Sequence, residues 1–173
     1  MVKIAGLVFF IAAVVGASRR DSNKTFANLQ EIDTAANTLT GISNAWDGKA
    51  EGANDVVASA NALVSLVEAA NYDASEQAVI SSEDSAVIVS YFPDTIEPDF
   101  LGAFNALVVH KANFDAAGAS LDVLYALRDL KSKTDAFGTT LGIVISADHQ
   151  DDVRAAIYQL DNDFSKIIDA FSE

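Results

Sequence analysis

Apolar side chains recur every three or four positions along almost the whole chain from Ser22 onward. This is the spacing of one face of an amphipathic α-helix, so the sequence predicts a series of helices that each bury one stripe. The clearest stripe begins at Val123 and ends at Val144. Gly48 and Gly118 are expected to end the helices that precede them. Similar stripes predict helices over residues 29–46, 56–70, 104–117 and 153–171.

The segment AVIVSYF, residues 86–92, is rich in β-branched side chains and would also suit a buried strand. A single strand would have no partner in an otherwise helical chain, so we expect a helix here as well. Pro93 and Pro98 are expected to bracket a turn after it. Short connections between long amphipathic helices favour antiparallel neighbours. The predicted fold is therefore all-α, an antiparallel bundle of five to six amphipathic helices.

The N-terminal segment differs in character from the rest of the chain. A single lysine precedes the apolar run Ile4–Val15, and small residues follow that run. This layout predicts a secretory signal peptide over residues 1–17, because the apolar run is short for a membrane span. The pair Arg19-Arg20 is either a second processing site or simply exposed, so the mature chain would begin at Ser18 or Asp21. We expect a single domain over residues 21–173.

The charge balance narrows the classes of partner. The chain has 11 basic and 25 acidic residues, and removing residues 1–20 takes away three cations and no acid, so the net charge changes from −14 to about −17. Such a surface repels nucleic acid phosphates and anionic membranes. The chain has no cysteine, so helix packing has to stabilise it without disulfides. Asn23 begins an N-glycosylation sequon near the predicted mature N-terminus.

A search for catalytic and metal-binding patterns finds little. The chain has two histidines, His110 and His149, and no nucleophile-elbow, zinc-protease or phosphate-loop pattern. The run from Asp161 resembles the start of a calcium loop, but its sixth position is Lys166 and its twelfth is Ser172. We therefore predict no catalytic residue, metal site, cofactor or enzymatic activity. A hydrolase with an unrecognised site would need one of the histidines next to a serine and an acid.

Three polar residues lie on the predicted apolar stripes. Thr134 and Ser43 each carry a hydroxyl that either bonds the backbone carbonyl four residues earlier or faces a cavity and bonds a ligand head group. Lys111 lies between Leu107 and Phe114. Its ammonium either reaches from the bundle rim to water or marks the mouth of a channel, where it would pair with an acid or with a lipid carboxylate.

Several stretches together resemble the fungal hydrophobic surface-binding protein A and cell-wall galactomannoprotein family. The first two predicted helices also fit the family pattern, so the resemblance covers about residues 21–173. It implies a secreted all-helical domain, often glycosylated and associated with the cell wall, that holds fatty acids between helices or adsorbs to hydrophobic surfaces. It also implies secreted lipolytic enzymes as partners. The stretches are FLGAFNALVVHKANFDAAG (100–118), LYALRDLKSKTDAFGTTL (124–141) and IYQLDNDFSKIIDAF (157–171).

The sequence therefore predicts a secreted, non-catalytic protein, extracellular or associated with the cell wall, that binds hydrophobic surfaces or fatty acids in an apolar channel between helices. The predicted head-group contacts are Thr134 and Lys111. The alternative is a structural cell-wall or surface-coating mannoprotein whose apolar residues pack only against one another. Neither a nucleic acid partner nor a transmembrane segment in the mature chain is expected. The predicted channel lining consists of Leu107, Val108, Leu127, Phe137, Leu141, Ile157 and Phe164.

Overall fold

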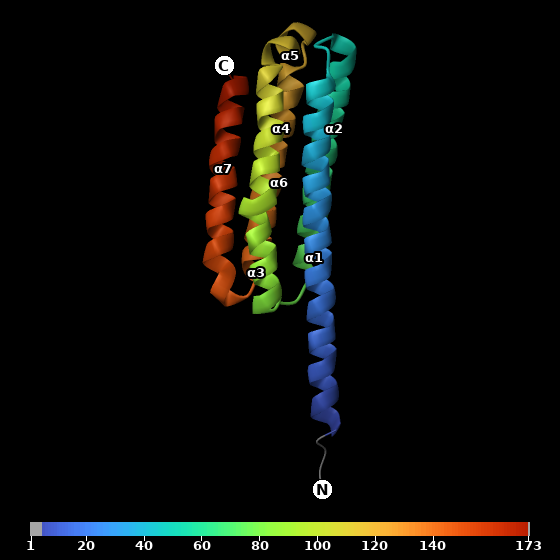
Figure 1. The fold of residues 1–173 in the computed structure, drawn as a ribbon, viewed down its shortest axis with the longest axis vertical. Coiled ribbons are helices and arrows are strands. Elements are labelled where there is room, and N and C mark those ends of the chain that lie inside the picture. The colour runs from blue at the N-terminus through green and yellow to red at the C-terminus, as the bar shows by residue number, and fades with distance from the viewer. Residues whose placement is uncertain (1–4, 173) are drawn as a thin grey trace.

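The protein is a bundle of long helices in the computed structural model, which describes the backbone of residues 5–172 and the side chains of residues 22–172 (Figure 1). No strand occurs among these residues, so the predicted all-α fold is confirmed. The elements are α1 (Ala5–Ala45), α2 (Ala50–Ser75), α3 (Ser82–Tyr91), the π-helical turn η1 (Phe92–Ile96), α4 (Glu97–Val109), α5 (Lys111–Ala117), α6 (Ser120–Val144), the 3₁₀ turn η2 (Ala147–His149) and α7 (Gln150–Ser172).

The predicted signal peptide is not tested by this structure. Residues 1–4 lie outside the described residues, and the side chains of residues 5–21 do as well. The backbone from Ala5 continues into α1, and this first part of α1 projects beyond the ends of the other helices (Figure 1). A signal peptide over residues 1–17 and a mature chain from Ser18 or Asp21 therefore stay predictions.

Two sequence predictions about local structure are wrong between residues 92 and 117. The expected turn between Pro93 and Pro98 is instead a continuous helical rod, in which η1 joins α3 to α4. Each proline stands in the first turn of its element, where its missing N–H is tolerated. The expected helix over residues 104–117 breaks at His110, which separates α4 from α5.

The two predicted glycine stops are confirmed. Gly48, between α1 and α2, has φ 81°, and Gly118, which follows α5, has φ 70°. Left-handed backbone of this kind strains residues that carry a Cβ, so glycine favours a chain reversal at both places.

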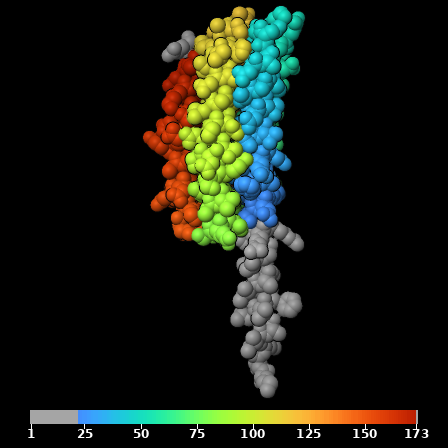
Figure 2. Space-filling model, in the orientation of Figure 1, coloured from blue at the N-terminus to red at the C-terminus, as the bar shows by residue number. Residues whose placement is uncertain are grey.

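The helices form two layers with opposite chain directions. The helix α1, the rod α3–η1–α4 and α7 run one way, whereas α2 and α6 run the other way (Figure 1). Figure 2 shows the face made by α1, the rod and α7. The contacts close a ring, because α1 packs on α2 and α4, and α7 packs on α6 and α4, while α2 packs on α6. Sequential helices are antiparallel as predicted, but several neighbours in this ring are parallel.

The core inside this ring is built from aromatic rings and small side chains. The rings of Phe104 and Phe164 have centroids 4.8 Å apart, and Phe100 lies 5.9 Å from each of them. These three side chains are at most 4% exposed. The inward faces of the neighbouring helices carry many alanines, which are Ala36, Ala53, Ala60, Ala70, Ala74, Ala103 and Ala106. Small residues let the helices approach closely around the aromatic cluster.

Of the two glycines in α6, Gly138 lies against α7 and Gly142 does not. A Cβ built there would lie 2.5 Å from Ile157 of α7, whereas a Cβ at Gly142 would meet nothing within 4 Å. We expect Gly138→Ala to lower the free energy of unfolding by about 1–3 kcal/mol through overpacking. We expect Gly142→Ala to raise it by about 0.5–1 kcal/mol through helix propensity.

Urea denaturation of the two single variants checks this prediction, and adding Ile157→Ala to the Gly138→Ala variant supplies the control. The added substitution removes the clashing methyl groups, so the penalty for alanine at 138 should shrink in that background. Equal stability of the two single variants would show that α7 does not lie as close to α6 as described.

Candidate functional site

Among the described side chains, the buried hydroxyls of Thr134, Ser43 and Ser146 have no hydrogen-bond partner, and the first two of these lie on the inward faces of long helices. Thr134 of α6 is 5% exposed and Ser43 of α1 is 0% exposed, and neither Oγ makes a hydrogen bond. Other hydroxyls on the same helices do bond their own backbone. Thr40 donates to the Ala36 carbonyl at 3.0 Å, and several threonines elsewhere on α1 and α6 behave alike. The two fully inward hydroxyls are therefore different from their neighbours.

This observation separates the two interpretations of Thr134. The sequence left open whether its hydroxyl donates to the Leu130 carbonyl or faces a ligand, and the structure contains no bond to Leu130. A buried hydroxyl without a partner destabilises a fold by about 1–3 kcal/mol, and such groups are rare in native proteins. An oxygen of a bound molecule would satisfy the donor of Thr134 or that of Ser43.

The structure buries most of the predicted lining residues in the core, spread along the length of the bundle. Five of them are almost fully buried in the same core, namely Leu107, Leu127, Phe137, Leu141 and Phe164. Ile157 is half-buried, and its side chain lies against Gly138 at the α6–α7 seam. Val108 is 42% exposed, so its inclusion in the channel lining is wrong for this structure. It lies at the end of α4, one residue beyond the buried Leu107.

Lys111 does not lie beside Thr134. Its Nζ lies 3.3 Å from Asp115 Oδ2 on α5, at the end of the bundle, and its side chain is 31% exposed. Thr134 lies about 14 residues into α6, which corresponds to about 21 Å along that helix. The predicted pairing of these two residues at one head group therefore fails. The break at His110 ends α4, so the stripe of α4 does not continue to Lys111.

The other cations of α6 also have separate partners. Lys131 Nζ lies 2.9 Å from Asp135 Oδ2 and also contacts Asp161 of α7, and Lys133 Nζ lies 2.5 Å from Glu68 of α2. The hydrogen bonds that Lys131 donates to Asp161 and Asp135 raise the pKa of Lys131. These lysines hold α6 to its two neighbours, so they do not gather into one anionic site.

Asp163 is a buried polar residue that the sequence did not single out as a site. It is 4% exposed, its Oδ1 accepts a hydrogen bond from Lys166 at 2.6 Å, and its Oδ2 has no partner. In the sequence, Asp163 was noted only as part of the run from Asp161 that resembles a calcium loop but lacks its key residues. Its position three residues after Leu160 and four before Ile167 could have shown that it lies beside the buried stripe of α7.

Three grooves run along seams between helices. The groove between α6 and α7 has a volume of about 540 Å³, the groove between the rod and α7 about 460 Å³, and the groove between α1 and α2 about 390 Å³. The largest is lined by Gly138, Gly142, Ile143, Ile157 and Tyr158, with charged groups along it. These grooves are outside the ring of core side chains that contains Thr134 and Ser43.

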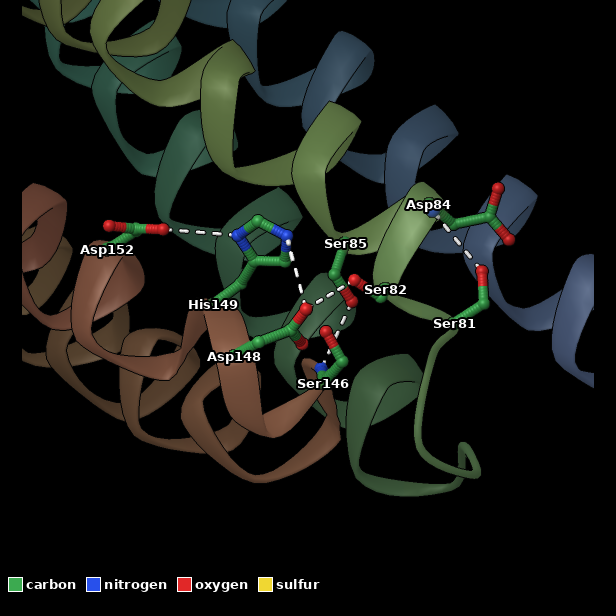
Figure 3. A network of polar contacts seen from close by, with 8 residues as sticks. All are labelled: Ser81, Ser82, Asp84, Ser85, Ser146, Asp148, His149 and Asp152. Carbon is green, nitrogen blue, oxygen red and sulfur yellow. Dashed lines mark hydrogen bonds and ion pairs between the residues drawn. The ribbon is translucent and has the colours of Figure 1, made fainter.

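His149 does not take part in a hydrolase-like arrangement (Figure 3). Its Nδ1 lies 3.1 Å from Asp152 Oδ2, and its Nε2 lies 3.8 Å from Asp148 Oδ2. The Ser82 hydroxyl donates to Asp148 and not to the imidazole. Both ring nitrogens therefore face carboxylates. A serine hydrolase instead needs an imidazole nitrogen free to accept the proton of a serine.

The network around His149 stabilises a turn instead. The Ser146 N–H donates to Ser85 Oγ at 3.1 Å, which ties the end of α6 to α3 (Figure 3). Ser81 caps α3 by accepting a hydrogen bond from the Asp84 N–H at 3.2 Å. His110 lies at the other end of the bundle, where its ring centroid is 5.3 Å from that of Trp46.

Two further features concern ions and membranes. Among the described residues, no group of three or more histidine, cysteine, aspartate or glutamate side chains is placed to hold a metal ion. No helix in the described part of the chain is long and apolar enough to cross a membrane.

The predicted sequon lies on α1 near the start of the described side chains. Asn23 is exposed, but Thr25 is buried and its hydroxyl donates to Gln77 Oε1 at 2.6 Å. The third sequon residue is therefore packed against the loop that follows α2 in the folded state. Glycosylation of Asn23 stays a prediction, and it would have to precede folding.

Known structures share this fold over nearly their whole length. The structure of AFMP4P in complex with palmitic acid is 29% identical, with a TM-score of 0.83, and the match covers 87% of this chain and 99% of that one. Ligand binding domain 1 of the Penicillium marneffei MP1 protein, complexed with arachidonic acids, is 16% identical with a TM-score of 0.82, over 88% of this chain and 99% of that one.

Ligand binding domain 2 of the same MP1 protein, complexed with multiple arachidonic acids, is 19% identical with a TM-score of 0.80, over 86% of this chain and 94% of that one. No curated protein sequence matches the chain. The family model of hydrophobic surface binding protein A matches residues 23–142. That match spans well over half of the sequence and includes both unpartnered hydroxyls, and the chain therefore belongs to the hydrophobic surface binding protein A family.

Proposed function

We propose that the protein is a non-catalytic binder of fatty acids, and that the acyl chain lies inside the helical ring with its carboxylate near Thr134 or Ser43. The observation that carries this proposal is the pair of buried, unpartnered hydroxyls of Thr134 and Ser43 on inward faces that are mainly apolar. A carboxylate accepts hydrogen bonds and would satisfy either donor. The palmitic acid bound by AFMP4P, which shares 29% identity and nearly the whole fold, supports the same class of ligand.

The energetics of an acyl chain fit this core. Each methylene transferred from water contributes about 0.8 kcal/mol, so a long acyl chain needs only one or two polar anchors to bind well. The acyl chain has to displace some of the core side chains or push them apart. The alanines on the inward faces of α1, α2 and α4 reduce the number of large side chains that an acyl chain would have to move.

Native mass spectrometry of the purified protein, followed by displacement of a fluorescent fatty acid, tests this proposal. We expect co-purified or added palmitate to appear as a mass increment of one fatty acid, and we expect saturable displacement of the probe. Protein that carries no lipid and shows no saturable binding would remove the proposal of an internal channel.

A second candidate function is adsorption to hydrophobic surfaces without a small ligand. Large apolar side chains are exposed at both ends of the bundle, with Val109 at 77% and Leu121 at 61% at one end and Ile143 at 67% at the other. Binding to octyl-coated beads separates the two functions. Adsorption that Val109→Asp and Leu121→Asp abolish, in a protein that takes up no fatty acid, would favour the surface-coating function.

We also propose secretion, with the signal peptide over residues 1–17 removed and the domain 21–173 acting outside the cell or at the cell wall. The layout of the N-terminal residues and the acidic composition support this. Secreted lipolytic enzymes would be natural partners for such a fatty-acid binder. The mass of the secreted protein reports both the cleavage position and any sugar on Asn23.

The lack of catalysis is part of the same proposal. His149 lies between two carboxylates and His110 lies against an indole ring, so neither is arranged as a general base for a serine. Any esterase activity of the purified protein should survive His110→Ala and His149→Ala together. Its loss in that double variant would favour a hydrolase.

A further inference from the structure

The seam between α1 and α4 is held by an acidic cluster and not by an ion pair. The Asn37 side-chain amide donates to Asp33 Oδ1 and to Asp99 Oδ2, both at 2.9 Å. The Tyr91 hydroxyl donates to Asp33 Oδ2 at 3.1 Å. Within the described residues, no ion pair involves either aspartate. We call these four side chains the acid latch.

The rod beside this seam is interrupted by the π-helical turn η1, between the two residues that it contributes to the acid latch. Tyr91 is the last residue of α3 and Asp99 is near the start of α4, so η1 separates them. In η1 the Glu97 N–H donates to the carbonyl of Phe92, and the prolines at 93 and 98, the only two in the chain, have no N–H to donate. Helical segments with five-residue bonding are rare and are often functional.

The seam leads to one of the unpartnered hydroxyls. A Cβ built at Gly102 of α4 would lie 3.7 Å from the Thr40 hydroxyl of α1, so the two backbones are close there. Ser43, which is fully buried and has no hydrogen-bond partner, is one turn further along α1. Separation of α4 from α1 at this level would open a path to the Ser43 hydroxyl.

The charge balance at the acid latch depends on protonation. Burial and the hydrogen bond with Asp99 raise the pKa of Asp33, so the folded protein holds a proton there above the ordinary pKa of an aspartate. The ionisable groups that face Asp33 are Tyr91 from α3 and Asp99 from α4. The π-helical turn η1 contributes one ionisable residue, Asp94. On the side of α1 that packs against α2, Asp73 forms an ion pair with Lys24.

We propose that the α1–α4 seam is the gate through which a fatty acid reaches the core, with η1 as its hinge and the acid latch as its pH-sensitive lock. This gate rests on the proposed fatty-acid function. At acidic pH Asp33 holds a proton, and the acid latch holds α4 against α1. As the pH rises and Asp33 ionises, its repulsion by Asp99 loosens the seam.

A reversible disulfide across the seam tests the position of the gate. The chain has no cysteine, so Thr40→Cys with Gly102→Cys introduces one pair of thiols at positions where a Cβ at 102 would lie 3.7 Å from the Thr40 hydroxyl. We expect oxidation of this variant to slow uptake of cis-parinaric acid at least tenfold in stopped-flow fluorescence. Reduction should restore the rate of the wild type.

The matched control places the same kind of lock on another seam. Asn71 of α2 and Thr140 of α6 are in hydrogen-bond contact at 2.6 Å, so Asn71→Cys with Thr140→Cys tethers those helices. Uptake by the oxidised control should stay within about twofold of the wild type. Circular dichroism of each reduced variant checks that it is folded.

The acid latch is tested by Asp33→Asn, with Glu31→Gln on the same helix as the control. For the wild type we expect release of cis-parinaric acid to accelerate about three- to tenfold between about pH 4 and about pH 7, because Asp33 loses its proton over this range. Asp33→Asn should flatten this dependence, because a neutral amide that does not titrate replaces the Asp33 carboxyl group. Glu31 is exposed and faces the α1–α2 groove, so Glu31→Gln should keep the dependence of the wild type.

The outcomes are distinguishable. A wild type that binds no probe would overturn the proposed fatty-acid function and the gate with it. A wild type that binds, together with an oxidised Thr40→Cys, Gly102→Cys variant that takes up the probe at an unchanged rate, would overturn the gate alone.

Unfolding by urea gives a ligand-independent check of the lock. The raised pKa of Asp33 stabilises the fold at low pH, and this contribution is lost as the pH rises. Glu31→Gln keeps this contribution and Asp33→Asn lacks it, so the free energy of unfolding of Asp33→Asn minus that of Glu31→Gln should increase between about pH 4 and about pH 7. A difference that does not change with pH would overturn the lock.

Discussion

Thr134→Val is expected to stabilise the delipidated protein and at the same time to weaken its binding of palmitate. Valine keeps the branched shape and removes a buried hydroxyl that has no partner, so the free energy of unfolding should rise by about 1–2 kcal/mol. If the same hydroxyl donates to the carboxylate, its loss should raise the dissociation constant about tenfold, because hydrogen bonds to charged groups contribute about 1.5–3 kcal/mol. Urea denaturation and fluorescent-probe displacement measure the two effects.

Thr140→Val on the same helix is the matched control. The Thr140 hydroxyl already bonds Asn71 Oδ1 at 2.6 Å, so its loss should destabilise the fold and leave palmitate affinity unchanged. A Thr134→Val protein that is less stable than the wild type would show that the hydroxyl has a partner in solution. Unchanged palmitate affinity in Thr134→Val would place the carboxylate elsewhere, and Ser43→Ala would then be the variant to test.

Phe164→Ala is expected to be the most destabilising single substitution in the core. Phe164 is 0% exposed, and its ring lies 4.8 Å from that of Phe104 and 5.9 Å from that of Phe100. Removing a buried ring of this kind lowers the free energy of unfolding by about 3–5 kcal/mol, through lost transfer energy and the cavity left behind. Thermal and urea unfolding measure this change.

Tyr158→Ala is the control on the same helix, because Tyr158 is 68% exposed. It should change the free energy of unfolding by about 0.5 kcal/mol or less. If Phe164→Ala cost no more than Tyr158→Ala, the ring of Phe164 would not be at the centre of the core in solution. The comparison therefore tests the packing on which the proposed channel depends.

The helices themselves were predictable because their apolar stripes are long and regular. Stripes over residues 56–70 and 123–144 lie within α2 and α6, and Gly48 and Gly118 mark helix ends as expected. The rod from Ser82 to Val109 was less predictable. Proline is compatible with both a turn and the first turn of a helix, so the local sequence around Pro93 and Pro98 supports either.

The position of Lys111 could not be read from the spacing. Leu107, Lys111 and Phe114 share one stripe only if a single helix passes through His110, and the chain breaks at that residue. Leu107 and Phe114 both stay buried, but Lys111 reaches Asp115 at the end of the bundle. A one-residue break therefore separated the cation from the core.

Thr134 and Ser43 could be identified from the sequence because a hydroxyl on an apolar stripe is conspicuous. Whether each finds a backbone partner depends on side-chain rotamer and helix packing, so only the structure shows that both are unpartnered. The Asp33–Asp99 contact could not be predicted at all. It requires α1 and α4 to be parallel neighbours, and the loop lengths give no information on helices that are not consecutive.

An isotope-filtered NMR experiment on the protein bound to ¹³C-labelled palmitate tests directly whether the acyl chain lies inside the helical ring. We expect nuclear Overhauser effects between palmitate methylenes and the rings of Phe100, Phe104 and Phe164, which form the centre of the core. Contacts confined to Ile143 and Tyr158, in the outer groove between α6 and α7, would contradict it.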